Sequence, residues 1–147
     1  MKKIVVSACL LGRNCKYSGG NNRNEAVIAY LKDKEYLPVC PEVEAGMPVP
    51  RPPVELRDGK VISIGGKDLD AVYRKGVAKV MEAISKEEIS LAILKAKSPT
   101  CGVHEIYDGT FTGKKISGQG ILAEALAEKG IPVCDEKDIE RQLEVRS

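Results

Sequence analysis

The sequence contains no tryptophan and a single phenylalanine, and its five tyrosines are scattered along 147 residues. Proteins that bind single-stranded nucleic acid combine a basic groove with aromatic side chains on which bases stack, and this chain has no such patch. Its basic residues outnumber its acidic ones by only two, 23 against 21, whereas nucleic-acid-binding surfaces show a strong basic excess. We therefore expect no nucleic-acid partner. The charge balance does not exclude a basic pocket for one small anion.

Long apolar runs and a dense cysteine framework are missing as well. No stretch reaches the roughly 18 apolar residues that a membrane helix needs, and the apolar run over residues 4–11 is too short for a signal peptide and lacks a cleavage site. The five cysteines are odd in number and fall below the density of a small disulfide scaffold. These absences predict a cytoplasmic enzyme with reduced thiols and no membrane contact.

Short apolar runs alternate with segments of helical periodicity, which predicts an α/β fold. The expected strands are Ile4–Ala8, Glu35–Cys40, Ile89–Lys95 and Ile131–Cys134. The expected helices cover residues 25–31, 69–84, 117–129 and 138–145. Runs that are apolar throughout are typical of strands buried on both faces. We therefore expect a single domain over residues 1–147, built as a three-layer sandwich around a mostly parallel, four-stranded, Rossmann-like sheet.

The segment Pro41–Pro53 separates the second strand from the rest and contains five prolines. Proline lacks a backbone donor and fixes φ, so we expect a stiff loop here that is neither helix nor central strand. Loops of this length inside compact domains are usually functional. Residues 54–64, which flank Asp58-Gly59, are predicted to form a small hairpin, and residues 107–111 a turn with short extended flanks.

Cysteines follow the predicted strands at Cys9, Cys40, Cys101 and Cys134. The carboxyl ends of parallel strands lie on one edge of a sheet, where open α/β sheets bind ligands, so we expect thiols to converge there. Cys134, in Ile-Pro-Val-Cys, is interpreted as core packing. Cys15, in the polar loop after Cys9, is compatible with a ligand, a redox-sensitive thiol or an incidental residue.

Convergent thiolates favour zinc, copper(I) or an iron–sulfur cluster. A structural zinc site usually needs four ligands, often in Cys-x-x-Cys pairs, and the sequence has no such pair. Cys101 and His104 have a Cys-x-x-His spacing, which is a weak signal on its own. Three cysteines, by contrast, can hold a cubane cluster and leave its fourth iron without a protein ligand, and an open position is what distinguishes a catalytic metal site.

Six motifs occur in order along the chain. They are Val6-Ser-Ala-Cys-Leu-Leu-Gly12, Tyr17-Ser-Gly-Gly20, Val39-Cys-Pro-Glu42 with Gly46-Met-Pro-Val-Pro-Arg51, Leu94-Lys-Ala-Lys-Ser-Pro-Thr-Cys-Gly102, Ile106-Tyr-Asp-Gly109 and Gly118-Gln-Gly-Ile121. Together they resemble the thiouracil desulfidase family, long known as a domain of unknown function. The resemblance extends from about Lys3 to Cys134, in the stand-alone form of the family.

The resemblance implies a [4Fe-4S]-dependent enzyme that hydrolytically removes sulfur from 4-thiouridine monophosphate or 2-thiouracil and releases hydrogen sulfide. By the same resemblance Cys9, Cys40 and Cys101 bind the cluster, and Glu42 and Ser98 are the acid–base residues. Soft sulfur binds iron well, which fits a substrate thiocarbonyl on the open iron. Cys15 departs from the family pattern, so no ligand role is carried over to it.

A nucleotide substrate would need a phosphate site. Ser117, Gly118 and Gln119 lie where a helix is predicted to begin, and free N–H groups at a helix start favour anions, although an ordinary helix cap explains the same residues. Ser7, at the end of the first strand, is a second candidate for substrate contact. Arg51, Lys95 and Lys97 lie close to the site motifs.

Two alternatives from other classes stay open. The first is a metal-independent thiol oxidoreductase or sulfurtransferase that uses Cys9 or Cys15 directly, although the chain lacks the Cys-x-x-Cys signature. The second is a non-enzymatic iron–sulfur or zinc module, in which Cys15 completes the ligand set. Cluster-free activity would favour the first, and a fully ligated cluster the second.

Overall fold

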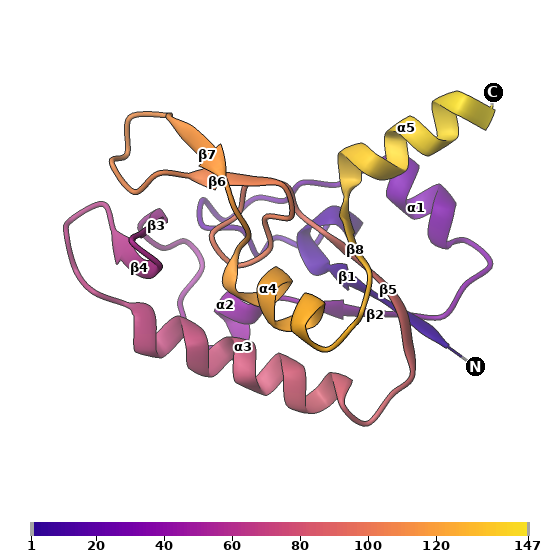
Figure 1. The fold of residues 1–147 in the computed structure, drawn as a ribbon, viewed down its shortest axis with the longest axis horizontal. Coiled ribbons are helices and arrows are strands. Elements are labelled where there is room, and N and C mark those ends of the chain that lie inside the picture. The colour runs from indigo at the N-terminus through magenta and orange to yellow at the C-terminus, as the bar shows by residue number, and fades with distance from the viewer. Residues whose placement is uncertain (1, 147) are drawn as a thin grey trace.

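A parallel β-sheet forms the centre of the computed structural model, which describes residues 2–146 (Figure 1). Its strands are β1 (Lys3–Ser7), β2 (Tyr36–Val39), β5 (Ile89–Leu94) and β8 (Val133–Asp135). They pair in the order β2-β1-β5-β8, and every pair is parallel. The α/β class and the four expected strands are therefore confirmed, with strand ends that differ by one or two residues.

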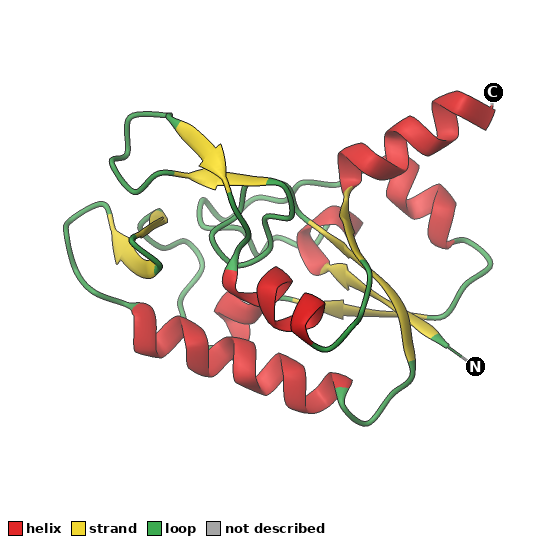
Figure 2. Cartoon of the chain, viewed as in Figure 1, coloured by secondary structure: helices red, strands yellow, loops and turns green. Residues whose placement is uncertain are grey.

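Helices cover both faces of this sheet (Figure 2). One face is covered by α1 (Glu25–Leu31) and α5 (Glu136–Arg146), and the other by α3 (Asp70–Ile84) and α4 (Ile121–Glu128). Successive side chains of a strand point to opposite faces, so Val5 packs with α3 and α4 while Ile4 and Val6 pack with α1. The predicted three-layer sandwich is confirmed. Among the described residues no helix is long and apolar enough to cross a membrane.

One expectation is wrong. The proline-rich segment begins with a short helix, α2 (Pro41–Glu44), and not with a loop. Proline is tolerated at the first helical position because the N–H it lacks has no intrahelical partner there. Cys40 takes the extended N-cap conformation, and Ala45 N closes the turn by donating to Pro41 O at 2.9 Å. The helix places Glu42 in its first turn.

Two antiparallel hairpins lie at one end of the molecule, away from the N-terminus (Figure 1). They are β3 (Val54–Arg57) with β4 (Lys60–Ser63), as predicted, and β6 (Glu105–Tyr107) with β7 (Lys115–Ser117). Glu55 Oε1 joins them, because it accepts hydrogen bonds from Gly109 N at 3.0 Å and Phe111 N at 3.2 Å. A 3-10 turn, η1 (Ala8–Leu11), follows β1.

Helix α3 supports α2 through a glycine. Gly76 lies on the buried side of α3, where a Cβ atom would collide with Pro41 O and would lie 2.7 Å from Ala45 Cβ. Only a residue without a side chain lets the two helices approach this closely. The position of Glu42 therefore depends on Gly76.

Replacing Gly76 with alanine should destabilise the protein. At an open helix position this change would stabilise by roughly 1 kcal/mol through helix propensity, but overpacking a close contact costs about 1–3 kcal/mol. We expect urea denaturation to show a net loss of unfolding free energy, whereas Lys79→Ala on the exposed side of α3 should change it by less than about 0.5 kcal/mol. A Gly76→Ala variant more stable than the wild type would show that α2 and α3 move apart at this contact without cost.

Candidate functional site

The carboxyl ends of β1, β2 and β5 open into a cavity of about 660 Å³. Residues that follow each of these strands line it, together with Val54, Ile64 and Phe111 from the hairpins. The chain passes from β1 to β2 on one side and later reaches β5 on the other side of β1. The cavity therefore lies at the switch point where open α/β sheets bind ligands.

Four cysteines line this cavity, and each reaches it from a different turn. Cys9 lies in η1 after β1, Cys40 precedes α2 after β2, Cys101 lies in the loop after β5, and Cys15 lies in the loop after η1. Cys101 is buried and the other three are half-buried. The predicted convergence of thiols is confirmed, and so is the packing role of Cys134, which lies among core residues.

The surroundings of the four thiols differ. Burial raises the pKa of Cys101 to about 12 and also raises the pKa of Cys9. A hydrogen bond to Cys15 is the main cause of the raised pKa of Cys40, and the same bond lowers the pKa of Cys15 to about 7. The charge of Glu42 acts on all four. Since thiolates are the metal-binding form, cation binding here is coupled to proton release.

The spacing of the sulfur atoms suits a cluster better than a single ion. Among the described residues, no three cysteine sulfurs lie within 4.8 Å of one another. Around one zinc ion, thiolates about 2.3 Å from the metal would lie only about 3.8 Å apart. Iron–sulfur clusters take cysteine thiolates as ligands, so the thiols of Cys9, Cys40 and Cys101 at one cavity are the kind of donor set that such a cluster needs.

Two further side chains bring hydrogen-bond donors to the cavity. Arg51 is buried, donates to Cys15 O at 2.9 Å and Pro48 O at 3.3 Å, and makes no ion pair within the described residues. Tyr73 Oη is a buried polar atom for which the described residues provide no partner. A buried polar atom without a partner, such as Tyr73 Oη, is uncommon in native proteins. A thiolate-bound cluster, which is negatively charged and rich in sulfur acceptors, would give Tyr73 Oη an acceptor and Arg51 an opposite charge.

Glu42 is held by one hydroxyl group, which is in turn held by a second. Thr100 Oγ1 donates to Glu42 Oε1 at 2.7 Å, and Ser98 Oγ lies 3.0 Å from Thr100 Oγ1. The other carboxylate oxygen, Oε2, lies 3.6 Å from Cys40 Sγ. Both predicted acid–base residues, Glu42 and Ser98, thus line the cysteine cavity.

Sequence reasoning missed Thr100 and Tyr73. Thr100 has no accessible surface, and its place between Pro99 and Cys101 gives no pattern of its own. Tyr73 sits at a core position of the amphipathic helix α3, where an apolar residue would give the same periodicity. Only the fold brings both to the cavity.

Ser7 also lies at the cavity, as predicted, but its hydroxyl oxygen forms a hydrogen bond within the sheet. Ser7 Oγ accepts a hydrogen bond from Lys95 N at 3.0 Å, which joins the ends of β1 and β5. Lys95 in turn pairs with the buried Glu136, Nζ to Oε2 at 3.0 Å. These contacts fix the edge of the sheet and occupy Lys95.

The helix start predicted at Ser117 is wrong. Ser117 ends strand β7, and helix α4 begins at Ile121 with Gly120 as its N-cap. Ser117, Gly118 and Gln119 do not line the cavity. The first N–H groups of α4 are already used, because Ile121 donates to Pro99 O, and Leu122 and Ala123 donate to Thr100 O, at 3.1, 2.8 and 3.3 Å. These groups anchor the loop of Cys101, which leaves no free donors for a phosphate.

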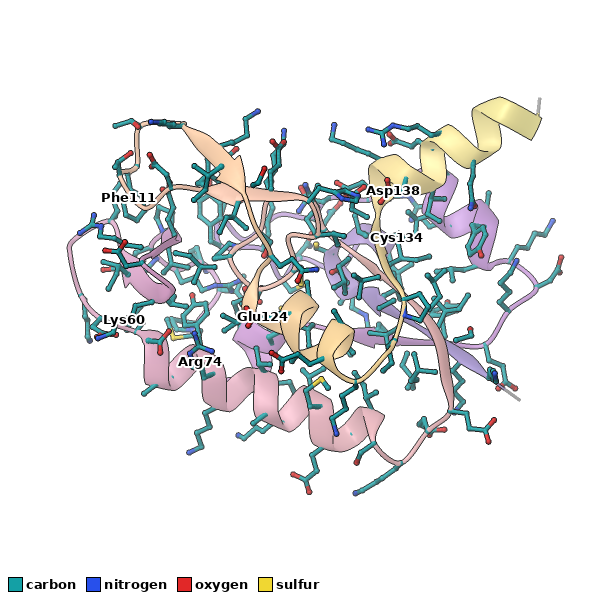
Figure 3. All side chains as sticks on the ribbon, in the orientation of Figure 1. Lys60, Arg74, Phe111, Glu124, Cys134 and Asp138 are labelled. Carbon is teal, nitrogen blue, oxygen red and sulfur yellow. The ribbon has the colours of Figure 1, made fainter. Side chains whose placement is uncertain are left out.

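His104 lies away from the thiols. It is exposed, and its Nε2 lies 2.8 Å from Asp138 Oδ2 at the start of α5. Figure 3 shows Cys134 and Asp138 near that helix start, well apart from Phe111 on the loop between β6 and β7. Although His104, Asp135 and Asp138 lie close together, the two carboxylates accept each other's backbone N–H and cap α5. The Cys101 and His104 spacing therefore forms no joint site.

The His104–Asp138 hydrogen bond raises the pKa of His104 above its ordinary value. A raised pKa means that the protonated ring stabilises the folded state at low pH, and that this gain is lost as the pH rises through the raised pKa. Because the ring is exposed, we expect less than about 1 kcal/mol. Denaturation at pH 5 to 9 should show this gain in the wild type and its absence in His104→Gln. Lys137→Gln should keep the wild-type pH dependence, and identical curves for wild type and His104→Gln would refute the contact.

Comparisons with known proteins agree with this geometry. The model of the 2-thiouracil desulfurase family matches residues 4–138. The uncharacterized protein YbbK of Bacillus subtilis (strain 168) is 35% identical over 146 residues, which cover 92% of this chain and 97% of YbbK. The solved structure of the [4Fe-4S]-dependent thiouracil desulfidase TudS has a TM-score of 0.87 at 33% identity, covering 99% of each chain.

Proposed function

The chain belongs to the 2-thiouracil desulfurase family, and on this premise we propose that it is a [4Fe-4S]-dependent desulfidase that removes sulfur from a thiolated uracil. The observation that carries the proposal is the convergence of Cys9, Cys40 and Cys101 on one cavity that also contains Glu42. Family membership and the TudS likeness favour this activity over a metal-independent thiol enzyme or a non-enzymatic module.

Cys9, Cys40 and Cys101 are the proposed ligands, one from the end of each of three neighbouring strands. A cluster held by these three cysteines would have one iron without a protein ligand and would supply a soft Lewis acid for the thiocarbonyl sulfur of the substrate. Arg51 and Tyr73 supply positive charge and a hydrogen-bond donor beside Cys40 and Cys15. Hydrogen bonds of this kind orient metal ligands and tune the metal.

We infer that the reaction is a hydrolysis, in which water supplies the oxygen that replaces sulfur. The overall exchange, thiouracil plus water to uracil plus hydrogen sulfide, needs neither an oxidant nor a reductant. Glu42 is the proposed acid–base residue, because its Oε2 is free of Thr100 and faces the cysteine sulfurs. It takes a proton from the attacking water at Oε2 and returns it to the departing sulfide.

The cavity volume of about 660 Å³ falls in the usual range for small-molecule sites. Lys97 lines it with a left-handed backbone, φ 66°, and its pKa is lowered chiefly by the neighbouring charge of Lys115. A phosphate beside Lys97 would relieve this repulsion. We therefore propose that Lys97 and Lys115, and not residues 117–119, meet the phosphate when the substrate is 4-thiouridine monophosphate.

Anaerobic reconstitution with iron and sulfide tests the function. We expect a broad brown absorbance, together with sulfide release from 2-thiouracil or 4-thiouridine monophosphate. Cys9→Ser, Cys40→Ser and Cys101→Ser should each lose both signals, since each removes a ligand. Cys134→Ser is the matched control, because Cys134 lies outside the cavity, and it should keep both.

Each other outcome has a distinct meaning. A wild-type protein that forms no cluster refutes the cofactor. A cluster without sulfide release refutes the substrate class. Loss of the cluster in Cys15→Ser would show four protein ligands and favour the non-enzymatic module.

Glu42→Gln should abolish proton transfer while the cluster stays bound. General acid–base catalysis contributes about 10²- to 10⁴-fold, so we expect kcat to fall by at least about 100-fold with unchanged visible absorbance. Glu44→Gln, on the exposed side of the same short helix, should retain wild-type kcat. Comparable rates for Glu42→Gln and the wild type would remove Glu42 from the mechanism.

A further inference from the structure

Two side chains of the loop Ser98–Gly102 form a hydrogen-bonded chain with Glu42 of α2, and the structure fixes its direction. Glu42 as a carboxylate only accepts hydrogen bonds, so the single proton of Thr100 Oγ1 is directed to Glu42 Oε1 at 2.7 Å. Thr100 Oγ1 also lies 3.6 Å from Cys101 Sγ, but sulfur is a weak acceptor and the carboxylate oxygen is the stronger and nearer one. Thr100 must then accept from Ser98, whose Oγ lies 3.0 Å away.

Ser98 has no hydrogen-bonding capacity left for a substrate. A serine hydroxyl offers one proton and two lone pairs. The proton goes to Thr100, and Ser98 Oγ accepts from Thr100 N and Cys101 N, both at 3.1 Å. Glu42 Oε2, at the other end of the chain, accepts only from the Cys40 thiol at 3.6 Å among the described residues, and a carboxylate oxygen has a second lone pair that stays available toward the cavity.

Helix α4 holds Thr100 in place from behind. Leu122 N and Ala123 N donate to Thr100 O, and Gly120 N donates to Gly102 O at 2.8 Å. A Cβ atom at Gly120 would lie 2.5 Å from Thr100 O, so the close approach of the start of α4 to Thr100 requires glycine at this position. Thr100 has no accessible surface, and the shortest hydrogen bond that its buried hydroxyl makes is the one to Glu42 Oε1.

We propose that Thr100 is the positioning residue of the reaction, which holds Glu42 with Oε2 toward the substrate, and that Ser98 acts on Glu42 only through Thr100. This inference rests on the proposed function of Glu42. It changes the role expected for Ser98 from an acid–base residue to a support for Thr100.

The test compares Thr100→Val with Thr100→Ser in reconstituted enzyme. Valine keeps the shape of threonine and removes the hydroxyl, whereas serine keeps the hydroxyl. We expect Thr100→Val to lower kcat about 10- to 100-fold with KM within about twofold, because the substrate does not touch Thr100. Thr100→Ser should restore kcat to within about threefold of the wild type. Cluster absorbance should be equal in all three proteins.

A double-mutant cycle separates the two roles of Ser98. If Ser98 acts through Thr100, Ser98→Ala on the Thr100→Val background should lower kcat by less than about twofold further, since the chain is already broken. If the fall in kcat of the double variant equals the product of the falls in the two single variants, Ser98 acts independently of Thr100, and the proposal is overturned. A Thr100→Val enzyme with wild-type kcat, or one that Thr100→Ser fails to rescue, would overturn it as well.

The control for folding is the melting temperature of each variant without cluster. A drop shared by Thr100→Val and Thr100→Ser, with equal loss of kcat, assigns Thr100 a packing role and overturns the proposal. Wild-type enzyme that carries its cluster but releases no sulfide contradicts the proposed function instead. The two failures are therefore distinguishable.

Discussion

The hydrogen bonds between the first turn of α4 and the loop after β5 fix most of the site. Helix starts present N–H groups without intrahelical partners, and here the carbonyls of Pro99 and Thr100 occupy them. This contact sets the backbone that carries Ser98, Thr100 and Cys101, and so one proposed metal ligand and the support of the proposed acid–base residue are positioned together. In other proteins the start of a helix often attracts a bound anion. Here the start of α4 binds carbonyl groups of the protein's own loop.

The opposite wall of the cavity depends on a second close approach. Gly76 lets α3 pack against α2, and α2 places Cys40 at its N-cap and Glu42 in its first turn. The hydrogen bond between Thr100 and Glu42 then joins the two walls across 58 residues of sequence. Cys40 and Glu42, the proposed metal ligand and proton-transfer group, are held by the same short helix, and the hydrogen bond to Thr100 fixes Glu42 relative to the loop of Cys101.

Much of this was accessible from the sequence because it depends on local patterns. Apolar runs predicted the strands, and a parallel sheet brings the residues after those strands to one edge, so Cys9, Cys40 and Cys101 could be placed together without coordinates. Helix α2 was missed because the prolines of the segment Pro41–Pro53 were counted as helix breakers, although Pro41 stands at the first helical position, which accepts proline. The start of α4 was placed too early because β7 is only three residues long and exposed. Thr100 and Tyr73 carry no local signal, since their roles arise from contacts between distant segments.

The charges around the cavity act on the thiols in two opposite ways. Glu42 places a negative charge near four thiols, which disfavours their ionisation, while Arg51 is buried beside Cys15 without a carboxylate partner in the described chain. A cationic iron core reverses the first effect, because it favours thiolates and tolerates the carboxylate nearby. The net negative charge of the thiolate-bound cluster then complements Arg51. Arg51 and Glu42 thus place one charge of each sign beside the thiols that are proposed to hold the cluster, and Glu42 lies next to Cys40.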